Sequence, residues 1–281
     1  MIDGLLLLGG GVLAGLFGSL LGLGGGILIV PLLTLGFGLT LIQAVGVSLI
    51  CVIVTSGAAA GVYLERRVAN LRLGMTLELF TAIGALGGGL IAFLIEERVL
   101  ELLFAALLAW VAYTMFPRAN PASARVLAPD ADPEVPDAGA SLSTGGTGTF
   151  IDGLSGPGYQ IRRLRLGAAG SVGAGVASAL LGIGGGLIKV PVMHVVMGVP
   201  LRVATATSNL MIGITASASA IIYLLRGEID PYVAAPTAIG VFLGASVGSR
   251  VAHRIDLRIL RGLFVAILLY TAWQMLQRAI A

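Results

Sequence analysis

The sequence is poor in charge, cysteine and histidine. Charged residues make up 11% of its 281 residues, against about 25% in ordinary globular domains. It holds one cysteine, Cys51, so no intrachain disulfide can form, and its two histidines are too few to suggest a metal centre. The arginines gather near the ends of apolar runs, which is typical of membrane topology signals and not of a nucleic-acid-binding face.

Three common enzyme signatures are also missing. Gly22-x-Gly24 is followed by Ile27, where a dinucleotide-binding fingerprint requires glycine. His-Glu-x-x-His and Cys-x-x-Cys do not occur. We therefore expect that the protein is not an enzyme, and that it holds no cofactor and no metal.

Long apolar runs dominate instead. Hydrophobic residues make up 57% of the chain, the mean hydropathy is +1.00, and there are 42 glycines. Apolar runs of about 20 residues are typical of transmembrane helices, and glycine lets such helices pack closely. The composition predicts an all-α polytopic membrane protein that contacts the lipid bilayer.

One glycine motif occurs twice. Segments 22–31 and 182–191 both read Gly-x-Gly-Gly-Gly-x4-Pro, and ten of 22 residues are identical when 13–34 is aligned with 173–194. Glycine weakens a helix, and the residue before a proline is disfavoured in the α region. Each copy therefore predicts a helix that breaks, crosses a turn and restarts.

The similarity continues beyond the motif. Thr-Ala-Ile-Gly recurs at 81–84 and 237–240. We predict two tandem homologous repeats of about four spans each, in residues 1–117 and 163–281. Between them, 118–162 is rich in proline, glycine and polar residues, which predicts a flexible linker.

The predicted spans have the same order in both repeats. They are 40–64, 73–95 and 99–116, then 200–225, 232–251 and 257–276, and they follow the broken elements 2–36 and 166–198. Because 35 residues are too long for one helix across a core of about 30 Å, each broken element is either a kinked span or a re-entrant hairpin. If each crosses once, ten arginines against six place the termini and linker in the cytoplasm; hairpins would make the repeats inverted.

Interrupted hydrophobic segments in matching positions of two halves point to a transporter's binding site. A half-helix that restarts in hydrocarbon directs free N–H groups and a positive dipole end at the gap, which suits an anion. Close helix packing is the alternative. The candidate residues are the last three glycines of each motif: Gly24, Gly25, Gly26, Gly184, Gly185 and Gly186.

Two further candidates follow the second motif. Lys189 is the only lysine of the chain. It is either an anion ligand at the depth of the helix break or a long side chain that snorkels to the interface. His194 could bind the anion or carry a proton near neutral pH, or it is only a hydrogen-bonded helix neighbour.

Polar side chains also begin the next predicted span. Thr207, Ser208 and Asn209 are adjacent, and Ser48 is the polar residue at the matching place in the first repeat. At least one of them should face the site, unless they only cap or connect helices. Glu78 is either a proton or cation site or a residue at the membrane interface, and the interface is favoured because Arg72 is six residues away.

Two such glycine motifs, about 160 residues apart in a glycine-rich chain of this length, resemble the TauE/SafE family of sulfite and organosulfur anion transporters. The resemblance covers both repeats and not the linker. It implies tandem repeats, a bacterial inner-membrane location, and export of sulfite or a related small sulfur anion.

Export also agrees with the energetics of an anion in a polarised membrane. An anion that leaves a cell with a negative interior gains about 2.3 kcal/mol per charge per 100 mV. Export therefore needs no buried carboxylate for cation coupling, and we expect almost none. An anion or solute channel and a non-transporting membrane scaffold are the alternatives. The specific anion, the coupling and the oligomeric state, a homo-oligomer included, stay open.

Shortening the linker 118–162 to a Gly/Ser tether should leave transport within a few-fold of the original rate, because flexible segments tolerate deletion when their ends can still be joined. The measurement is flux through purified protein in liposomes, beside the yield of monodisperse protein. A complete loss of folded protein would show that the segment packs against the helices.

Overall fold

The computed structural model describes residues 2–20, 25–65, 69–115, 159–251 and 257–280. In these ranges every regular element is a helix and no strand forms, so the all-α prediction is confirmed there. Among the described residues, four helices are long and apolar enough to cross a membrane. They comprise Leu71–Ala92, Leu164–Leu181, Val203–Leu225 and Pro231–Gly248.

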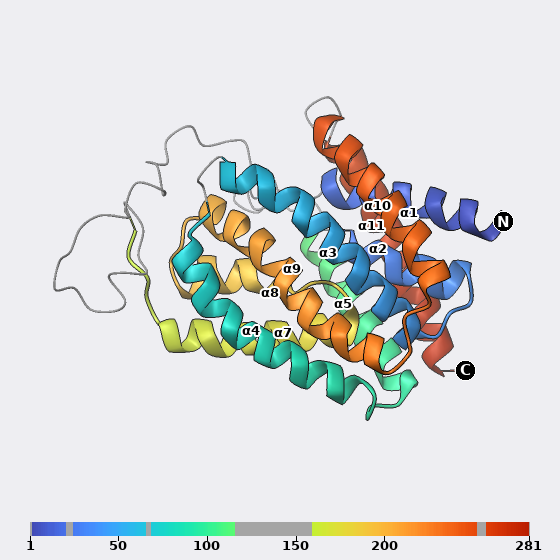
Figure 1. The fold of residues 1–281 in the computed structure, drawn as a ribbon, viewed down its shortest axis with the longest axis horizontal. Helices are drawn as coiled ribbons and strands as arrows, with labels where there is room; N and C mark the ends of the chain where they lie inside the picture. The colour runs from blue at the N-terminus through green and yellow to red at the C-terminus, as the bar shows by residue number, and fades with distance from the viewer. Residues whose placement is uncertain (1, 21–24, 66–68, 116–158, 252–256, 281) are drawn as a thin grey trace.

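The two halves place their helices in the same order (Figure 1). The first half contains α1 (Ile2–Leu20), α2 (Gly26–Pro31), the π-helix η1 (Leu32–Gly36), α3 (Leu41–Glu65), α4 (Leu71–Ala92) and α5 (Glu97–Met115). The second contains α7 (Leu164–Leu181), α8 (Gly186–Pro191), the π-helix η3 (Val192–Val196), α9 (Leu201–Leu225), α10 (Pro231–Val251) and α11 (Leu257–Ile280). The predicted spans coincide with α3, α4, α5, α9, α10 and α11 to within a few residues at most ends.

The segment from α7 to η3 is a hairpin. After Gly182, which has a φ of 68°, the chain runs back along α7, so that Val192 lies against Gly170 and Met197 against Gly167. The kinked-span alternative is therefore wrong for this element, because the glycines of α7 leave room for the returning segment. The arginine count placed the termini and linker in the cytoplasm on the assumption that each broken element crosses the membrane once. A hairpin does not meet that assumption, so the count no longer supports this placement.

The first broken element has similar local geometry where it is described. Gly25 has a φ of 78° and its carbonyl accepts the N–H of Leu28 at 3.1 Å, and Leu32 then lies against Gly10. A left-handed residue before a helix favours glycine, which has no Cβ to clash. Residues 21–24, with the candidate Gly24, lie outside the described residues.

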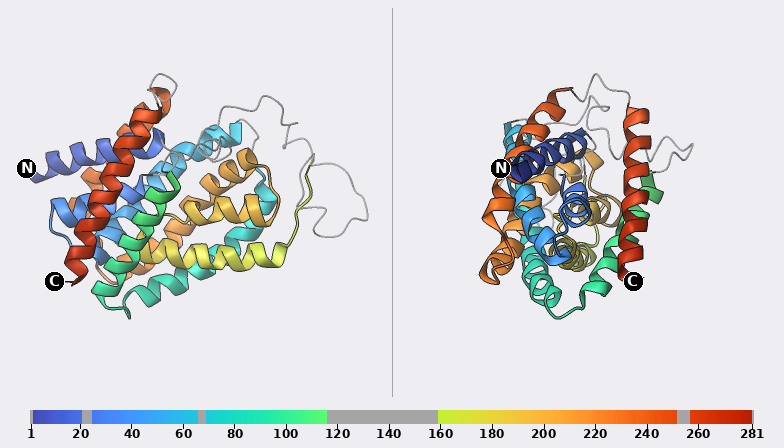
Figure 2. Two further views of the ribbon diagram at one scale, coloured as in Figure 1. Left: turned by 180° about the vertical axis from the view of Figure 1, so that it is seen from behind. Right: turned by 90° about the vertical axis from the view of Figure 1, so that its right-hand side faces the viewer.

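Most helix packing joins one half to the other. α1 lies along α10, α4 along α7, and α5 beside α11 (Figures 1 and 2). The glycines of α10 and α7 make the close contacts: Gly244 faces the backbone of Val12, and Gly175 faces that of Thr81. Small residues that let backbones approach are the usual basis of helix association in membranes.

In the centre, α3 crosses α9 in the opposite direction. Gly46, early in α3, lies against Tyr223 near the end of α9, whereas Ser56, later in α3, donates to the carbonyl of Asn209 near the start of α9 at 2.6 Å. These two helices hold matching places in the two halves, and their crossing brings the segments after both glycine turns to the middle of the protein.

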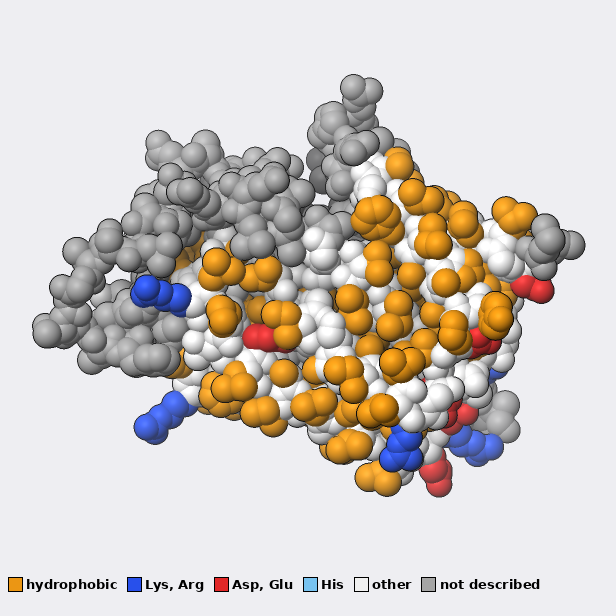
Figure 3. All heavy atoms as spheres, viewed as in Figure 1, with side chains coloured by type: hydrophobic (Ala, Val, Ile, Leu, Met, Phe, Trp, Pro, Cys, Tyr) orange, Lys and Arg blue, Asp and Glu red, His pale blue; other side chains and the backbone are white. Residues whose placement is uncertain are grey.

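The outer surface is largely apolar. Figure 3 shows a face covered by hydrophobic side chains, with few charged ones. On α4 the exposed positions form a continuous apolar stripe: Met75, Leu79, Ile83, Leu86 and Leu90. A helix that is apolar on its exposed face as well as inside is typical of a membrane span.

The predicted linker ends earlier than expected. Its last residues pack on the helices: Ile161 is buried, the N–H of Arg162 donates to the carbonyl of Met197 at 3.0 Å, and Tyr159 accepts from the amide of Asn70 at 2.7 Å. The buried side chain of Ile161 and the hydrogen bonds of Tyr159 and Arg162 hold residues 159–162 against the helices. Residues 116–158 lie outside the described residues.

Gly175→Ala should lower the midpoint of thermal unfolding in detergent, because a Cβ there would press on the backbone of Thr81 and Ala85. Overpacking typically costs about 1–3 kcal/mol. Gly173→Ala on the same helix is the matched control, since a Cβ there meets nothing within 4 Å and alanine favours a helix over glycine. Equal effects of the two changes would contradict the close packing of α4 on α7.

Candidate functional site

The only lysine of the chain is buried in an ion pair between the halves. Nζ of Lys189 lies 3.1 Å from Oε2 of Glu78 and 2.5 Å from Oγ1 of Thr215. The hydroxyl of Thr215 in turn donates to Oε1 of Glu78 at 2.6 Å. The side chains of Lys189 and Glu78 are only 1% and 6% exposed. Three helices, α8, α4 and α9, thus meet in one closed polar cluster.

One sequence-based expectation is wrong at this cluster, and one of the two alternatives for Lys189 is excluded. Glu78 does not lie at the interface, because it sits on the buried face of α4, whereas Arg72 near the start of the helix is exposed. Lys189 does not snorkel, because its ammonium finds both partners inside the protein. The expectation of almost no buried carboxylate fails with Glu78. The apolar neighbours of Glu78 in the sequence were a signal that it lies at depth.

The contact between α4 and α8 is stable only while Lys189 and Glu78 are both charged and paired with each other. Removing an ion from water costs several kcal/mol, and the partner offsets this only when the geometry is good. Here the carboxylate receives two hydrogen bonds and the ammonium donates two. Loss of one partner would leave the other charge buried alone.

Ser48 brings the two glycine turns together. Its Oγ lies 2.8 Å from the carbonyl oxygen of Gly182 and 3.2 Å from that of Gly26. Gly26 is so close to the carbonyl of Gly182 that a Cβ would not fit between them. The described parts of the two turns therefore meet beside α3, which is where the sequence predicts a shared site.

The second turn is tightly enclosed. Gly184 lies between Ile212 and Val52, Gly185 faces Ser178, and Gly186 faces Ile212. The carbonyl of Gly185 accepts the N–H of Lys189 at 3.0 Å and so begins α8. Close packing, which we considered as the alternative role of these glycines, is thus present at all three.

Two buried hydroxyls beside this turn have no hydrogen-bond partner among the described residues. They belong to Ser178 and Ser208, and both side chains are fully buried. Ser178 lies against Gly185, and Ser208 lies near Gly186. Buried polar groups are nearly always paired in folded proteins, and an exception often marks a place for water or a ligand.

The other polar candidates have structural contacts. The hydroxyl of Thr207 accepts the N–H of Asn70 at 2.9 Å at the start of α4. Asn209 uses its backbone carbonyl to bind Ser56. His194 is exposed on η3, and its Nδ1 lies 2.9 Å from the carbonyl oxygen of Val199. Within the predicted polar patch, Ser208 is the residue that faces the glycine turn.

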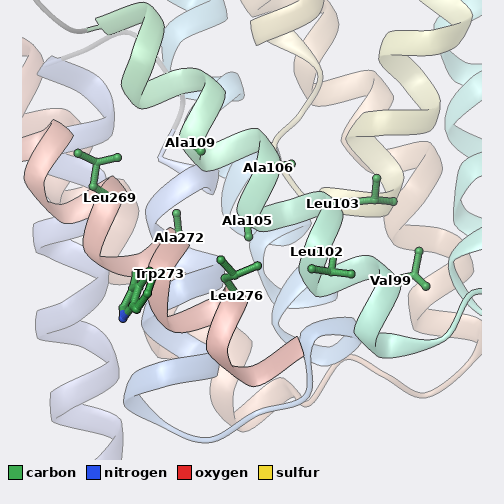
Figure 4. A pocket seen from close by; sticks show the side chains of 10 residues that line it. All are labelled: Val99, Leu102, Leu103, Ala105, Ala106, Ala109, Leu269, Ala272, Trp273 and Leu276. Atoms are coloured by element: carbon green, nitrogen blue, oxygen red, sulfur yellow. The ribbon is translucent and has the colours of Figure 1, made fainter. Parts of the chain in front are cut away.

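An apolar pocket lies elsewhere, between α5 and α11 (Figure 4). Leu102, Leu276 and Trp273 are among the side chains that line it, and none of the predicted site residues does. In the described part of the chain, no group of three His, Cys, Asp or Glu side chains is placed to hold a metal ion.

One motif with an enzyme-like spacing has a packing role. Residues 244–248 read Gly-Ala-Ser-Val-Gly, the spacing of a hydrolase nucleophile. They lie inside α10, where Gly244 and Gly248 contact α1 and the Ser246 hydroxyl donates to the carbonyl of Phe242 at 2.8 Å. A nucleophile of this kind requires a sharp strand-to-helix turn, which a continuous helix does not provide.

The described residues form a helical bundle with four helices of membrane-spanning length, an apolar outer face and a buried ion pair, and these features define an integral membrane protein. The chain belongs to the sulfite exporter TauE/SafE family, whose sequence profile matches residues 7–275. The resemblance seen in the sequence is confirmed.

Curated relatives carry transporter names. The chain is 24% identical over 277 residues to "Probable membrane transporter protein YunE" of Bacillus subtilis, with 96% of each chain covered. It is 26% identical to "Probable membrane transporter protein" of Xylella fastidiosa, covering 95% of this chain and 94% of that one. It also matches "Probable membrane transporter protein MamO" of Paramagnetospirillum magneticum at 27% identity, but spans only 43% of that protein. No solved structure matches. The protein is a membrane transporter of the TauE/SafE family.

Lys189→Met should lower the free energy of unfolding by about 3–5 kcal/mol, because it leaves the Glu78 carboxylate buried without its partner. The double variant Lys189→Met with Glu78→Leu should recover most of that loss, since no charge remains unpaired. Thermal unfolding of the purified protein in detergent measures both. If the double variant lost as much free energy of unfolding as the two single variants together, the ion pair would be contradicted. Glu101→Gln on α5 is the control, because it removes a buried carboxyl away from the cluster.

Proposed function

We propose that the protein is a secondary transporter that exports sulfite or a related small organosulfur anion across the inner membrane. The proposed binding site lies between two homologous repeats, where the glycine turns meet. The observation that carries the proposal is the buried ammonium of Lys189, placed one helical turn after the second glycine turn. A buried cation that follows a glycine turn, with two buried hydroxyls at that turn that lack a partner among the described residues, is a setting that suits an anion.

The proposed ligands come from both turns. On the second turn they are the backbone N–H groups of Gly184 to Gly186, the ammonium of Lys189 and the hydroxyl of Ser208. Gly25, Gly26 and Ser48 would face them from the first turn. Ser208 supports this choice because it is fully buried without a partner among the described residues. Thr207, Asn209 and His194 would act at the edge of the site by holding helices in place.

The opposite direction of α3 and α9 supports an inverted topology for the two repeats. These helices occupy matching positions in the two halves, yet Gly46 meets Tyr223 while Ser56 meets Asn209. Two matching spans that cross a bilayer in opposite directions are related by an axis in the membrane plane, as in many secondary transporters. A hairpin at each glycine motif is consistent with the same arrangement.

Export is supported by the family description and, for an anion that crosses with net negative charge, by the membrane potential. A negative cell interior drives an anion outward by about 2.3 kcal/mol per charge per 100 mV. The absence of a buried carboxylate no longer supports this direction, because Glu78 lies in the cluster itself.

Uptake into liposomes tests the function. Purified protein should move sulfite or a small sulfonate saturably and faster than sulfate, with thiosulfate and chloride as further probes. Flux that does not saturate and approaches channel rates would favour the anion channel. No flux of any probe through folded protein would contradict transport and favour a scaffold.

Lys189→Met should weaken anion binding to the purified protein about tenfold or more, because a charge-assisted hydrogen bond is worth about 1.5–3 kcal/mol. Lys189→Arg should be milder, although its planar fork needs a different geometry. Ile29→Met, at the matching position of the first half, is the control and should leave affinity within about two-fold, because it exchanges side chains of similar size. An unchanged dissociation constant for Lys189→Met would remove Lys189 from the site.

A further inference from the structure

We propose that Glu78 is a proton-binding site coupled to the anion, so that each anion that binds at Lys189 brings one proton to Glu78. The proposal rests on the transport function proposed above and assigns the coupling ion. It follows from the partners of Lys189 and from the lack of a matching pair in the first half.

The ammonium of Lys189 is already neutralised. Its neighbours within hydrogen-bond distance are the Glu78 carboxylate and the Thr215 hydroxyl. An anion that joined this cluster unchanged would put two negative charges beside one positive charge, in a place with almost no solvent exposure. An uncompensated buried charge is strongly unfavourable.

A proton on Glu78 restores the balance. The empty site holds Glu–COO⁻ and Lys–NH₃⁺; with anion A⁻ and H⁺ bound, it holds Glu–COOH and the pair Lys–NH₃⁺···A⁻. One O–H bond forms at Glu78, no other covalent bond changes, and the site is neutral in both states. The proton comes from the solution on the side from which the anion enters. A monovalent anion and its proton therefore cross together with no net charge, and the membrane potential does not drive their movement.

Thr215 has an alternative acceptor for the protonated state. Its hydroxyl donates to Glu78 at 2.6 Å, and the carbonyl of Met211 lies 3.1 Å away in the same helix. When Glu78 takes up a proton, the Thr215 hydroxyl can turn to Met211 and accept a hydrogen bond from the new carboxylic acid. The exchange leaves no buried donor without a partner, which keeps its cost low.

The neighbouring titratable groups do not compete for this role. On the elements packed around the cluster, Arg72 of α4, Arg165 of α7 and His194 of η3 are exposed. Tyr223 of α9 is buried, and its hydroxyl donates to the carbonyl of Ala179 at 2.8 Å. The side chain of Arg202 is not described. Among the described side chains, Glu78 is the carboxylate that touches Lys189.

The first half lacks the pair. With the 160- and 156-residue offsets between the halves, the positions of Lys189, Thr215 and Glu78 correspond to Ile29, Thr55 and Ala234. Ile29 is completely buried, and the Thr55 hydroxyl donates within its own helix to the carbonyl of Cys51. If the cluster only held a hairpin against the neighbouring helices, we would expect the same cluster in both halves. A charge pair in one half alone is what a single coupling site requires.

Proton uptake on anion binding tests the coupling. The full-length protein in weakly buffered detergent solution is titrated with methanesulfonate, a strong-acid anion that takes up no proton itself near neutral pH. Sulfite serves as a second probe, corrected with a protein-free titration. We expect about one proton taken up per anion bound, and an affinity that falls about tenfold for each unit of rising pH while the free site holds an ionised Glu78.

Glu78→Gln mimics the protonated carboxyl and should bind methanesulfonate with an affinity that no longer depends on pH and without proton uptake. Glu101→Gln, which removes a buried carboxyl that does not contact Lys189, should keep the pH dependence. Anion binding by the unaltered protein without proton uptake would overturn the coupling and leave anion transport intact, and this holds even if Glu78→Gln fails to fold. Binding of neither probe would overturn both proposals, whereas a Glu78→Gln protein that keeps the pH dependence would overturn the assignment to Glu78.

Discussion

The buried ion pair between Lys189 and Glu78 is the interaction on which the rest of this structure depends. It joins the α7–α8 hairpin of one half to α4 of the other half, and Thr215 of α9 closes it. Two charges at such depth are stable only while they stay together. Any rearrangement of the helices must therefore keep α8 in contact with α4, so that the two charges stay paired, or supply a new partner for each charge.

Glycine makes that arrangement sterically accessible. α4 lies along α7 and α1 along α10 because glycines such as Gly175 and Gly244 let the backbones approach. The same absence of side chains allows the chain to reverse after α7 and lets Ser48 contact the carbonyl groups of Gly182 and Gly26 at once. In a membrane, where packing replaces the hydrophobic effect as the force between helices, such contacts hold the bundle around its polar centre.

Much of this could be predicted from the sequence, because it depends on local chemistry. The apolar runs predict helices that match α3, α4 and α9, and the paired glycine and proline pattern predicts where the second broken element turns. The partner of Lys189 could not be predicted, since Glu78 is 111 positions away and only the packing of α4 on α7 and α9 brings it near. Arg72 suggested an interface for Glu78, because position along a helix does not reveal which face is buried. The choice between a kinked span and a hairpin likewise required long-range contacts, such as Val192 with Gly170.

The central claim is that an anion takes the place of Glu78 beside Lys189, and infrared difference spectroscopy of the reconstituted protein tests it most directly. Adding methanesulfonate should produce the carbonyl band of a protonated carboxylic acid and remove carboxylate intensity. Neither change should occur in Glu78→Gln, and both should persist in Glu101→Gln. Bound anion with no new carboxylic acid band, or with a band that persists in Glu78→Gln, would contradict the account.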